Sequence, residues 1–215
     1  MRQKPVALYA ACFLSFTGVF ALTGQRDSIL SSPVTFTEVM ANRVDVTETM
    51  TPYEEALLHP KRMAPLPPEK IDSETLWLAR AIFSETKRPE EQVLVAWVIR
   101  NRVETRYRGQ RTYRNVILDP YQFSAFAPTQ KTPIDYTSLT PHSEVPGWKT
   151  ALRIADHVRR SRPDVRPFSV ETRHFYSERS MVGRDAPEWA EGRRPIKNLP
   201  YSVDERRFRF FAGIA

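Results

Sequence analysis

The chain has 215 residues, enough for one domain with additional segments, and 41% of them are hydrophobic, which excludes a wholly disordered protein. Its 18 prolines against 7 glycines indicate extended segments and stiff loops. The formal charge of +7 is scattered along the chain and suits an anionic extracellular polymer at least as well as nucleic acid.

Residues 1–24 have the pattern of an export signal. Arg2 and Lys4 form a short positive region, and the uncharged apolar run Val6–Leu22 follows it. The run is short for a membrane span, yet an uncleaved inner-membrane anchor is an alternative. Cys12, the only cysteine, lies inside this run, so disulfides are not expected in the mature protein. We therefore expect export to the periplasm or cell envelope.

Residues 25–70 are predicted to form a proline-containing linker or extension. Six prolines interrupt the segment, and Met63–Pro68 is typical of a stiff, polyproline-like entry into a domain. A short helix around Tyr53–Leu58 is compatible with the sequence. The segment either spaces the domain from the membrane or packs on it as an arm. Residues 71–215 are expected to form the domain itself.

Two long helices are predicted at the start of this domain. Asp72 or Ser73 caps the first helix, which carries a broad apolar face and ends near Glu85. Pro89 suits the first position of the second helix. The stretch Val93–Ile99 is apolar almost all round, so the second helix should be the buried spine of the domain.

Glu85 is the candidate general acid. It lies at the border of the apolar face in the last helical turn, where partial burial and the helix dipole both favour the protonated form. Lys87 and Arg88 favour the ionised form, so the net direction of the pKa shift is left open. The alternative is a solvated glutamate at a fraying helix end.

The region after the second helix is less regular. Arg106–Arg114 mixes arginine with tyrosine, as nucleic-acid-binding patches do, but an exported protein seldom meets nucleic acid and no such partner is expected. Asp119–Phe126 is predicted to be a loop, Pro146–Arg162 an amphipathic helix, and Val170–Tyr176 and Arg207–Phe211 short paired strands.

The loop and the first strand supply candidates for sugar contact. Gln122 and Ser124 can hydrogen-bond hydroxyl and acetamido groups, while Phe123 is expected to plug the core beneath them as part of the same site. His174 and Tyr176 should point to the same face of their strand. Because no second His, Cys or carboxylate stands at ligand spacing, neither a metal nor a cofactor is expected.

Five segments carry motifs that occur together in one family: Leu78–Glu85, Gln92–Val103, Asp119–Ser124, Thr172–Tyr176 and Arg207–Phe210. In this order they resemble the L-A-x-x-I-[YF]-x-E segment, the Q-x-A-V-A-x-V-[IV]-x-N-R-V helix, the P-x-Q-F-S loop, the T-H-[FY] strand and the H-x-F-[FY] strand of the SleB/CwlJ-type cell-wall hydrolases. The resemblance covers about Ile71 to the C-terminus.

This resemblance implies an α+β fold, a mainly helical, lysozyme-like domain with a small β-element near the C-terminus. It implies cleavage of peptidoglycan between N-acetylmuramic acid and N-acetylglucosamine by a lytic transglycosylase, with Glu85 as the single catalytic acid and His174 or Tyr176 near it. A hydrolytic muramidase or a phage lysis enzyme with the same site is an alternative. A non-catalytic peptidoglycan-binding scaffold is an alternative of another class. The protein is expected to act as a monomer.

Two departures from the family pattern concern the site. The connection from Glu85 to Gln92 is shorter than usual and has Thr86-Lys87-Arg88 where the family commonly has A-R-G-E, so the shape of the cleft rim is not predicted. In the late strand, Arg173 separates Thr172 from His174, which are adjacent in the family, so no role is assigned to Thr172.

Overall fold

The computed structural model describes residues 50–128, 131–181, 183 and 185–214. The predicted export signal, residues 1–24, and the part of the predicted extension before residue 50 lie outside the described residues. Within the described ranges, no helix has both the length and the apolar character that crossing a membrane requires.

The described residues form a mainly helical structure with one small antiparallel sheet, which confirms the predicted α+β class. Short 3₁₀ turns connect the longer elements. The helices and strands are α2 (Pro52–Leu58), α3 (Ser73–Glu85), α4 (Pro89–Glu104), α5 (Tyr113–Leu118), α6 (Trp148–Arg160), β1 (Thr172–Tyr176) and β2 (Arg209–Ala212).

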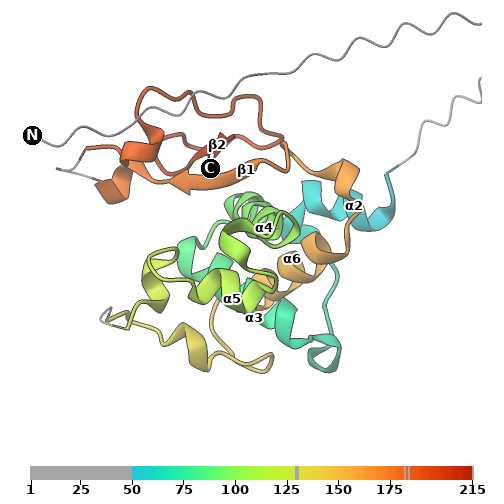
Figure 1. Cartoon of the computed structure of the whole chain (residues 1–215). Coiled ribbons are helices and arrows are strands. Elements are labelled where there is room, and N and C mark those ends of the chain that lie inside the picture. Colours follow the sequence, from blue (N-terminus) through green and yellow to red (C-terminus); the bar gives the residue numbers. More distant parts are fainter. Residues whose placement is uncertain (1–49, 129–130, 182, 184, 215) are drawn as a thin grey trace, which may run out of the picture. The chain divides into compact units, whose positions relative to one another are not determined.

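Helix α4 is the buried centre of the domain. Pro89 occupies its first turn, as predicted, and every residue from Val93 to Ile99 is buried, which confirms the predicted spine. In Figure 1, α4 lies between the two-stranded sheet and the helices α3, α5 and α6, and it contacts all of them. The middle of a helix in this position has no face left for water, which explains why the stretch Val93–Ile99 is apolar almost all round.

Helices α3 and α6 pack against each other and against α4. Asp72 caps α3 by accepting a hydrogen bond from the Thr75 amide at 2.7 Å. The ring of Phe83 on α3 meets that of Trp148 on α6 at 5.5 Å between centroids. The predicted face of α6 is buried as expected, with Trp148, Leu152, Ala155 and Val158 all at 3% exposure or less.

Helix α2 belongs to the segment expected to be a linker or extension, and it packs on the domain. Thr51 and Glu54 form a capping box at its start. Glu54 is only 2% exposed and accepts a hydrogen bond from Arg162 Nε at 2.8 Å. The Tyr201 hydroxyl donates to the carbonyl of Leu57. These contacts join α2 to the end of α6 and to the segment that precedes β2.

The sheet contains an irregularity at the position where the sequence departs from the family. Thr172 pairs with Ala212 and His174 pairs with Phe211, so Arg173 is an extra residue on β1. Such a β-bulge accommodates one inserted residue and leaves its backbone groups free for other partners. The residue that separates Thr172 from His174 is therefore accommodated within the pairing of β1 with β2.

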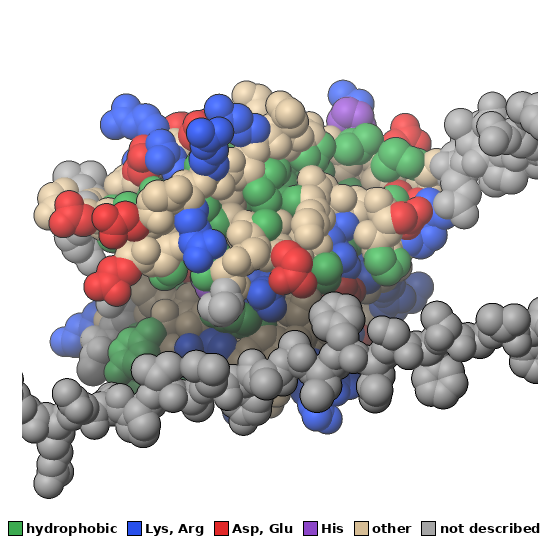
Figure 2. Space-filling model, turned by 45° about the horizontal axis from the view of Figure 1, so that its top comes forward, with side chains coloured by type: hydrophobic (Ala, Val, Ile, Leu, Met, Phe, Trp, Pro, Cys, Tyr) green, Lys and Arg blue, Asp and Glu red, His purple; other side chains and the backbone are tan. Residues whose placement is uncertain are grey.

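Helix α5 is an element that the sequence did not predict. Residues 106–114 were expected to be a basic stretch, but Tyr113 already belongs to the helix. Thr112 caps its N-terminus, and Glu74 of α3 accepts a hydrogen bond from the Tyr113 amide at 2.7 Å. On the face that Figure 2 shows, Lys and Arg side chains are interspersed with Asp and Glu side chains.

Candidate active site

An open cavity of about 390 Å³ lies where the end of α3, helix α4, the loop after α5 and the sheet meet. Five structural units contribute to it: the last residue of α3, helix α4, the loop after α5, the end of β1 with the turn that follows, and the residues just before β2. The side chains that line it are those of Glu85, Arg102, Tyr121, Gln122, Ser124, Phe175, Tyr176, Ser177, Arg179, Arg207 and Phe208.

Glu85 is the last residue of α3, and its carboxylate faces this cavity. The residue is partly exposed because of the cavity, while the core residues Ala81 to Phe83 behind it are fully buried. No hydrogen bond from any described residue reaches the carboxylate. Desolvation by the surrounding protein raises the pKa of Glu85 to about 7. A large fraction of the molecules therefore carries the proton at neutral pH.

Two cations oppose this rise in the Glu85 pKa without overcoming it. The larger opposing effect comes from Arg102 and the smaller from Lys87. The sequence predicted Lys87 and Arg88 in this role. Lys87 has it, whereas Arg88 approaches Glu91, with 4.0 Å between Nε and Oε1. Burial thus determines the direction of the Glu85 pKa shift, which the sequence left open: the pKa is raised.

Arg102 reaches the cavity from α4 and is itself buried, with 5% exposure. Its Nε donates a hydrogen bond at 2.7 Å to the carbonyl of Arg173, the extra residue of the β-bulge. Its guanidinium carbon lies 5.5 Å from the centroid of the Phe123 ring. Burial lowers the pKa of Arg102 to about 10, so the side chain remains charged at neutral pH. The bulge therefore fixes a permanent cation beside the acid.

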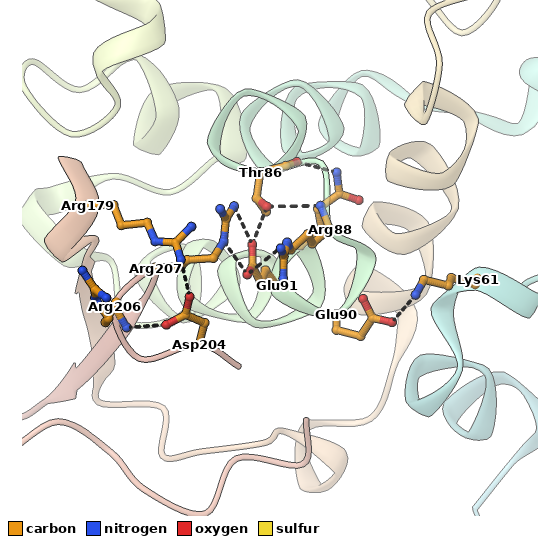
Figure 3. Close-up of polar contacts among 10 residues, drawn as sticks. Lys61, Thr86, Arg88, Glu90, Glu91, Arg179, Asp204, Arg206 and Arg207 are labelled. Atoms are coloured by element: carbon orange, nitrogen blue, oxygen red, sulfur yellow. Dashed lines mark hydrogen bonds and ion pairs between the residues drawn. The ribbon is translucent and has the colours of Figure 1, made fainter. Parts of the chain in front are cut away.

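The short turn after Glu85 is held by a hydrogen-bond network that Figure 3 shows in detail. Thr86 ends α3 and donates through its hydroxyl to Glu91 Oε2 at 2.5 Å. Gln92 Nε2 donates to the Thr86 carbonyl at 2.8 Å. Arg207, which also lines the cavity, binds Glu91 Oε1 through Nε at 2.9 Å. The connection that departs from the family sequence is thus held by side-chain hydrogen bonds, and Glu91 links it to Arg207 of the cavity lining.

The loop after α5 places its predicted residues at different depths. Gln122 and Ser124 line the cavity together with Glu85. Phe123 is only 3% exposed and packs on Phe175, with 6.4 Å between ring centroids, so it lies beneath the loop as expected.

His174 and Tyr176 lie on one face of β1, but at different distances from the cavity. Tyr176 lines the cavity, and its ring also meets Trp189. His174 is 7% exposed, lies between Tyr107 and Trp189, and shares a hydrogen bond of 3.0 Å between its Nε2 and the Tyr107 hydroxyl. Burial lowers the pKa of His174 to about 4, so its ring is neutral at neutral pH. The structure brings Glu85, Gln122, Ser124 and Tyr176 together and places Phe123 and His174 behind them.

The sequence reasoning missed the cationic and aromatic parts of the cavity wall. Arg102, Arg179, Arg207 and Tyr121 all line it, and none was a candidate. The signal for Arg102 was present, because it is the arginine of the N-R-V motif at the end of the second helix. Arg179 and Arg207 come from segments whose approach to α4 depends on the tertiary fold.

A family model described as Cell Wall Hydrolase matches residues 86–199, more than half of the chain. The chain belongs to the cell-wall hydrolase family. This confirms the resemblance to the SleB/CwlJ-type proteins and makes peptidoglycan the substrate of the hydrolase. Curated proteins and solved structures were also compared, and none matches the chain.

The family match contains Gln122, Ser124 and Tyr176 of the hydrolase, and it begins one residue after Glu85. The assignment of a role to Glu85 therefore depends on the geometry. No other carboxylate lines the cavity among the described residues, and these residues contain no group of three or more His, Cys, Asp or Glu side chains placed to hold a metal ion. A reaction at this cavity has one carboxylic acid available.

Proposed function

We propose that this cell-wall hydrolase is exported through residues 1–24 and cleaves glycan strands as a lytic transglycosylase, with Glu85 as its single general acid and base. The observation that carries the proposal is the carboxyl group of Glu85, whose pKa of about 7 and position in an open cavity suit proton transfer at neutral pH. Glycosidases that use two carboxylates require a second one across the scissile bond. Among the described residues that line this cavity, Glu85 is the single carboxylate.

The first step is protonation of the glycosidic oxygen between N-acetylmuramic acid and N-acetylglucosamine by Glu85. The bond from that oxygen to C1 of the muramyl sugar breaks, and the 4-hydroxyl of N-acetylglucosamine leaves. The resulting Glu85 carboxylate is stabilised by the charge of Arg102, the larger of the two cationic influences on it.

In the second step the Glu85 carboxylate removes the proton of the muramyl 6-hydroxyl, and the oxygen bonds to C1. The product is a 1,6-anhydromuramyl end, no water is consumed, and Glu85 is protonated again as it was at the start. Gln122 and Ser124 supply hydrogen-bonding groups for sugar hydroxyl and acetamido substituents from the loop, and Tyr176 supplies a hydroxyl and a ring face from the strand.

The test compares the Glu85→Gln variant with the wild type on purified sacculi. The digestion is carried out in oxygen-18 water with a chelator present, and the released products are identified by mass spectrometry. Gln keeps the size of the side chain but cannot transfer a proton, so release should fall by roughly 10²–10⁴-fold. The matched control is Glu74→Gln, which removes a carboxylate from the same helix at a position that contacts α5 and not the cavity. It should keep near-normal activity.

Each other outcome rejects a defined part of the proposal. Normal activity of Glu85→Gln would mean that another group is the acid. Products that carry oxygen-18 would show hydrolysis in place of transglycosylation. Binding to sacculi without any release by the unmodified protein would indicate a scaffold. A reporter fused after Lys70 that stays in the cytoplasm would reject the export signal.

A further inference from the structure

Tyr121 combines two properties that the folded structure alone does not explain. Its side chain is 99% exposed, the most exposed large hydrophobic side chain among the described residues. Its backbone has φ +65°, in the left-handed region that side chains other than glycine and asparagine rarely adopt. The residue therefore adopts an unfavourable backbone conformation while its ring packs against none of the described residues.

The strain arises from the turn that directs the chain from α5 to the cavity rim. The Gln122 amide donates to the Asp119 carbonyl at 3.2 Å, which closes a four-residue turn with Pro120 in its second position. A turn with proline second and positive φ third is of type II, and its third position favours glycine. Here the third residue is Tyr121.

A salt bridge holds this turn in place from outside. Asp119, whose side chain is 9% exposed, accepts a hydrogen bond from Arg108 Nε at 2.6 Å. Arg108 itself has φ +53°, again in the left-handed region. Backbone strain that the surroundings maintain tends to occur at functional sites, where it presents a group in a required direction.

We propose that Tyr121 is a stacking platform for a pyranose ring of the glycan strand, at the rim of the cavity that holds Glu85. Tyr121 lines the same cavity as Glu85 and Gln122, so a strand with its scissile bond at Glu85 extends across this rim. An exposed aromatic ring offers an apolar face to the C–H face of a sugar, and its hydroxyl stays in water. The inference rests on the proposed cleavage of glycan strands, because Tyr121 would bind a sugar ring of the same strand that Glu85 cleaves.

The experiment measures binding of peptide-free glycan strands to the full chain on ice, in the Glu85→Gln background so that the ligand is not cleaved. Tyr121→Gly and Tyr121→Asn keep a residue that tolerates positive φ and remove the ring. Both should raise the dissociation constant for glycan strands roughly three- to tenfold. Tyr121→Phe keeps the ring and should bind like the parent.

Thermal unfolding of the same variants separates a platform from a structural residue. Tyr121→Gly relieves the left-handed strain and loses no packing, so its melting temperature should rise while its affinity for glycan falls. Unchanged affinity of the Gly and Asn variants, or a lower melting temperature of the Gly variant, would overturn the inference. Failure of the proposed chemistry has a different readout: the Glu85→Gln variant with Tyr121 unchanged would keep its activity on sacculi. The two failures can therefore be told apart.

Discussion

Two glutamates flank the turn between α3 and α4, and their surroundings differ. On the α4 side, Glu91 is 2% exposed and accepts hydrogen bonds from both Thr86 and Arg207. On the α3 side, Glu85 faces the cavity and receives no hydrogen bond from any described residue, and burial raises its pKa to about 7. A desolvated carboxyl group that has no hydrogen-bonding partners tends to keep its proton. The difference indicates that Glu91 supports the fold and that Glu85 is available for chemistry.

The largest effect on stability is expected from Glu91→Gln. The substitution leaves the Arg207 guanidinium without its carboxylate and weakens the bond that ends α3 at Thr86. Loss of one partner of a buried pair destabilises strongly, and the partial exposure of Arg207 reduces the cost, which gives roughly 2–4 kcal/mol. Urea unfolding of the purified protein measures it. A variant as stable as the wild type would show that the network does not support the turn.

Glu85→Gln is expected to increase the stability of the fold above pH 7, whereas Glu91→Gln is expected to decrease it. Below pH 4.5 the glutamate is protonated in both the folded and the unfolded state, so the variant gains nothing. As pH rises from 4.5 through about 7, the unfolded state ionises first and the wild type loses stability. Above pH 7 the variant should be more stable by at most about 3 kcal/mol. Urea midpoints at pH 4 and pH 8 measure this difference, and equal gains at both would contradict the raised pKa.

The two helices and the position of Glu85 could be predicted from the sequence, but the direction of the Glu85 pKa shift could not. Hydrophobic periodicity and Pro89 located both helices, and the apolar face placed Glu85 at its border. The direction of the Glu85 pKa shift depends on the cavity, which is built from segments distant in sequence. The principal opposing cation is Arg102, on the next helix, and not the neighbouring Arg88, which approaches Glu91. Local sequence therefore located Glu85 as the candidate acid and misassigned one of the cations expected to act on it.

The elements that the sequence missed have a related cause. Helix α5 has six residues, too few for a clear periodic pattern, and its first amide is bound by Glu74 of another helix. The turn at Tyr121 lacks the glycine by which a type II turn is usually predicted. In both cases tertiary contacts impose a conformation that the local sequence disfavours or does not specify.

The smallest expected effect concerns Arg102 and the pH dependence of activity. Because the acid must be protonated, activity should fall as pH rises through about 7. Arg102 lowers the Glu85 pKa, so Arg102→Leu should move this alkaline limb upward, on the order of one pH unit. Arg102→Lys keeps a positive charge and should stay near the wild-type profile. The pH dependence of sacculus digestion measures both, and an unmoved limb in the Leu variant would mean that Arg102 does not set this pKa.

The contact between α2 and the segment before β2 has a consequence for the order of folding. Leu57 and Tyr201, joined by the hydrogen bond from the Tyr201 hydroxyl, stand 144 residues apart in the chain. Contacts of such long sequence separation form late, because closing the intervening loop is entropically costly until other contacts have shortened it. During synthesis α2 emerges before its partners, because Arg162 follows α6 and Tyr201 is made only near the end of the domain. The nascent chain therefore stays open at its N-terminal side, and the segment around α2 docks as one of the last steps of folding.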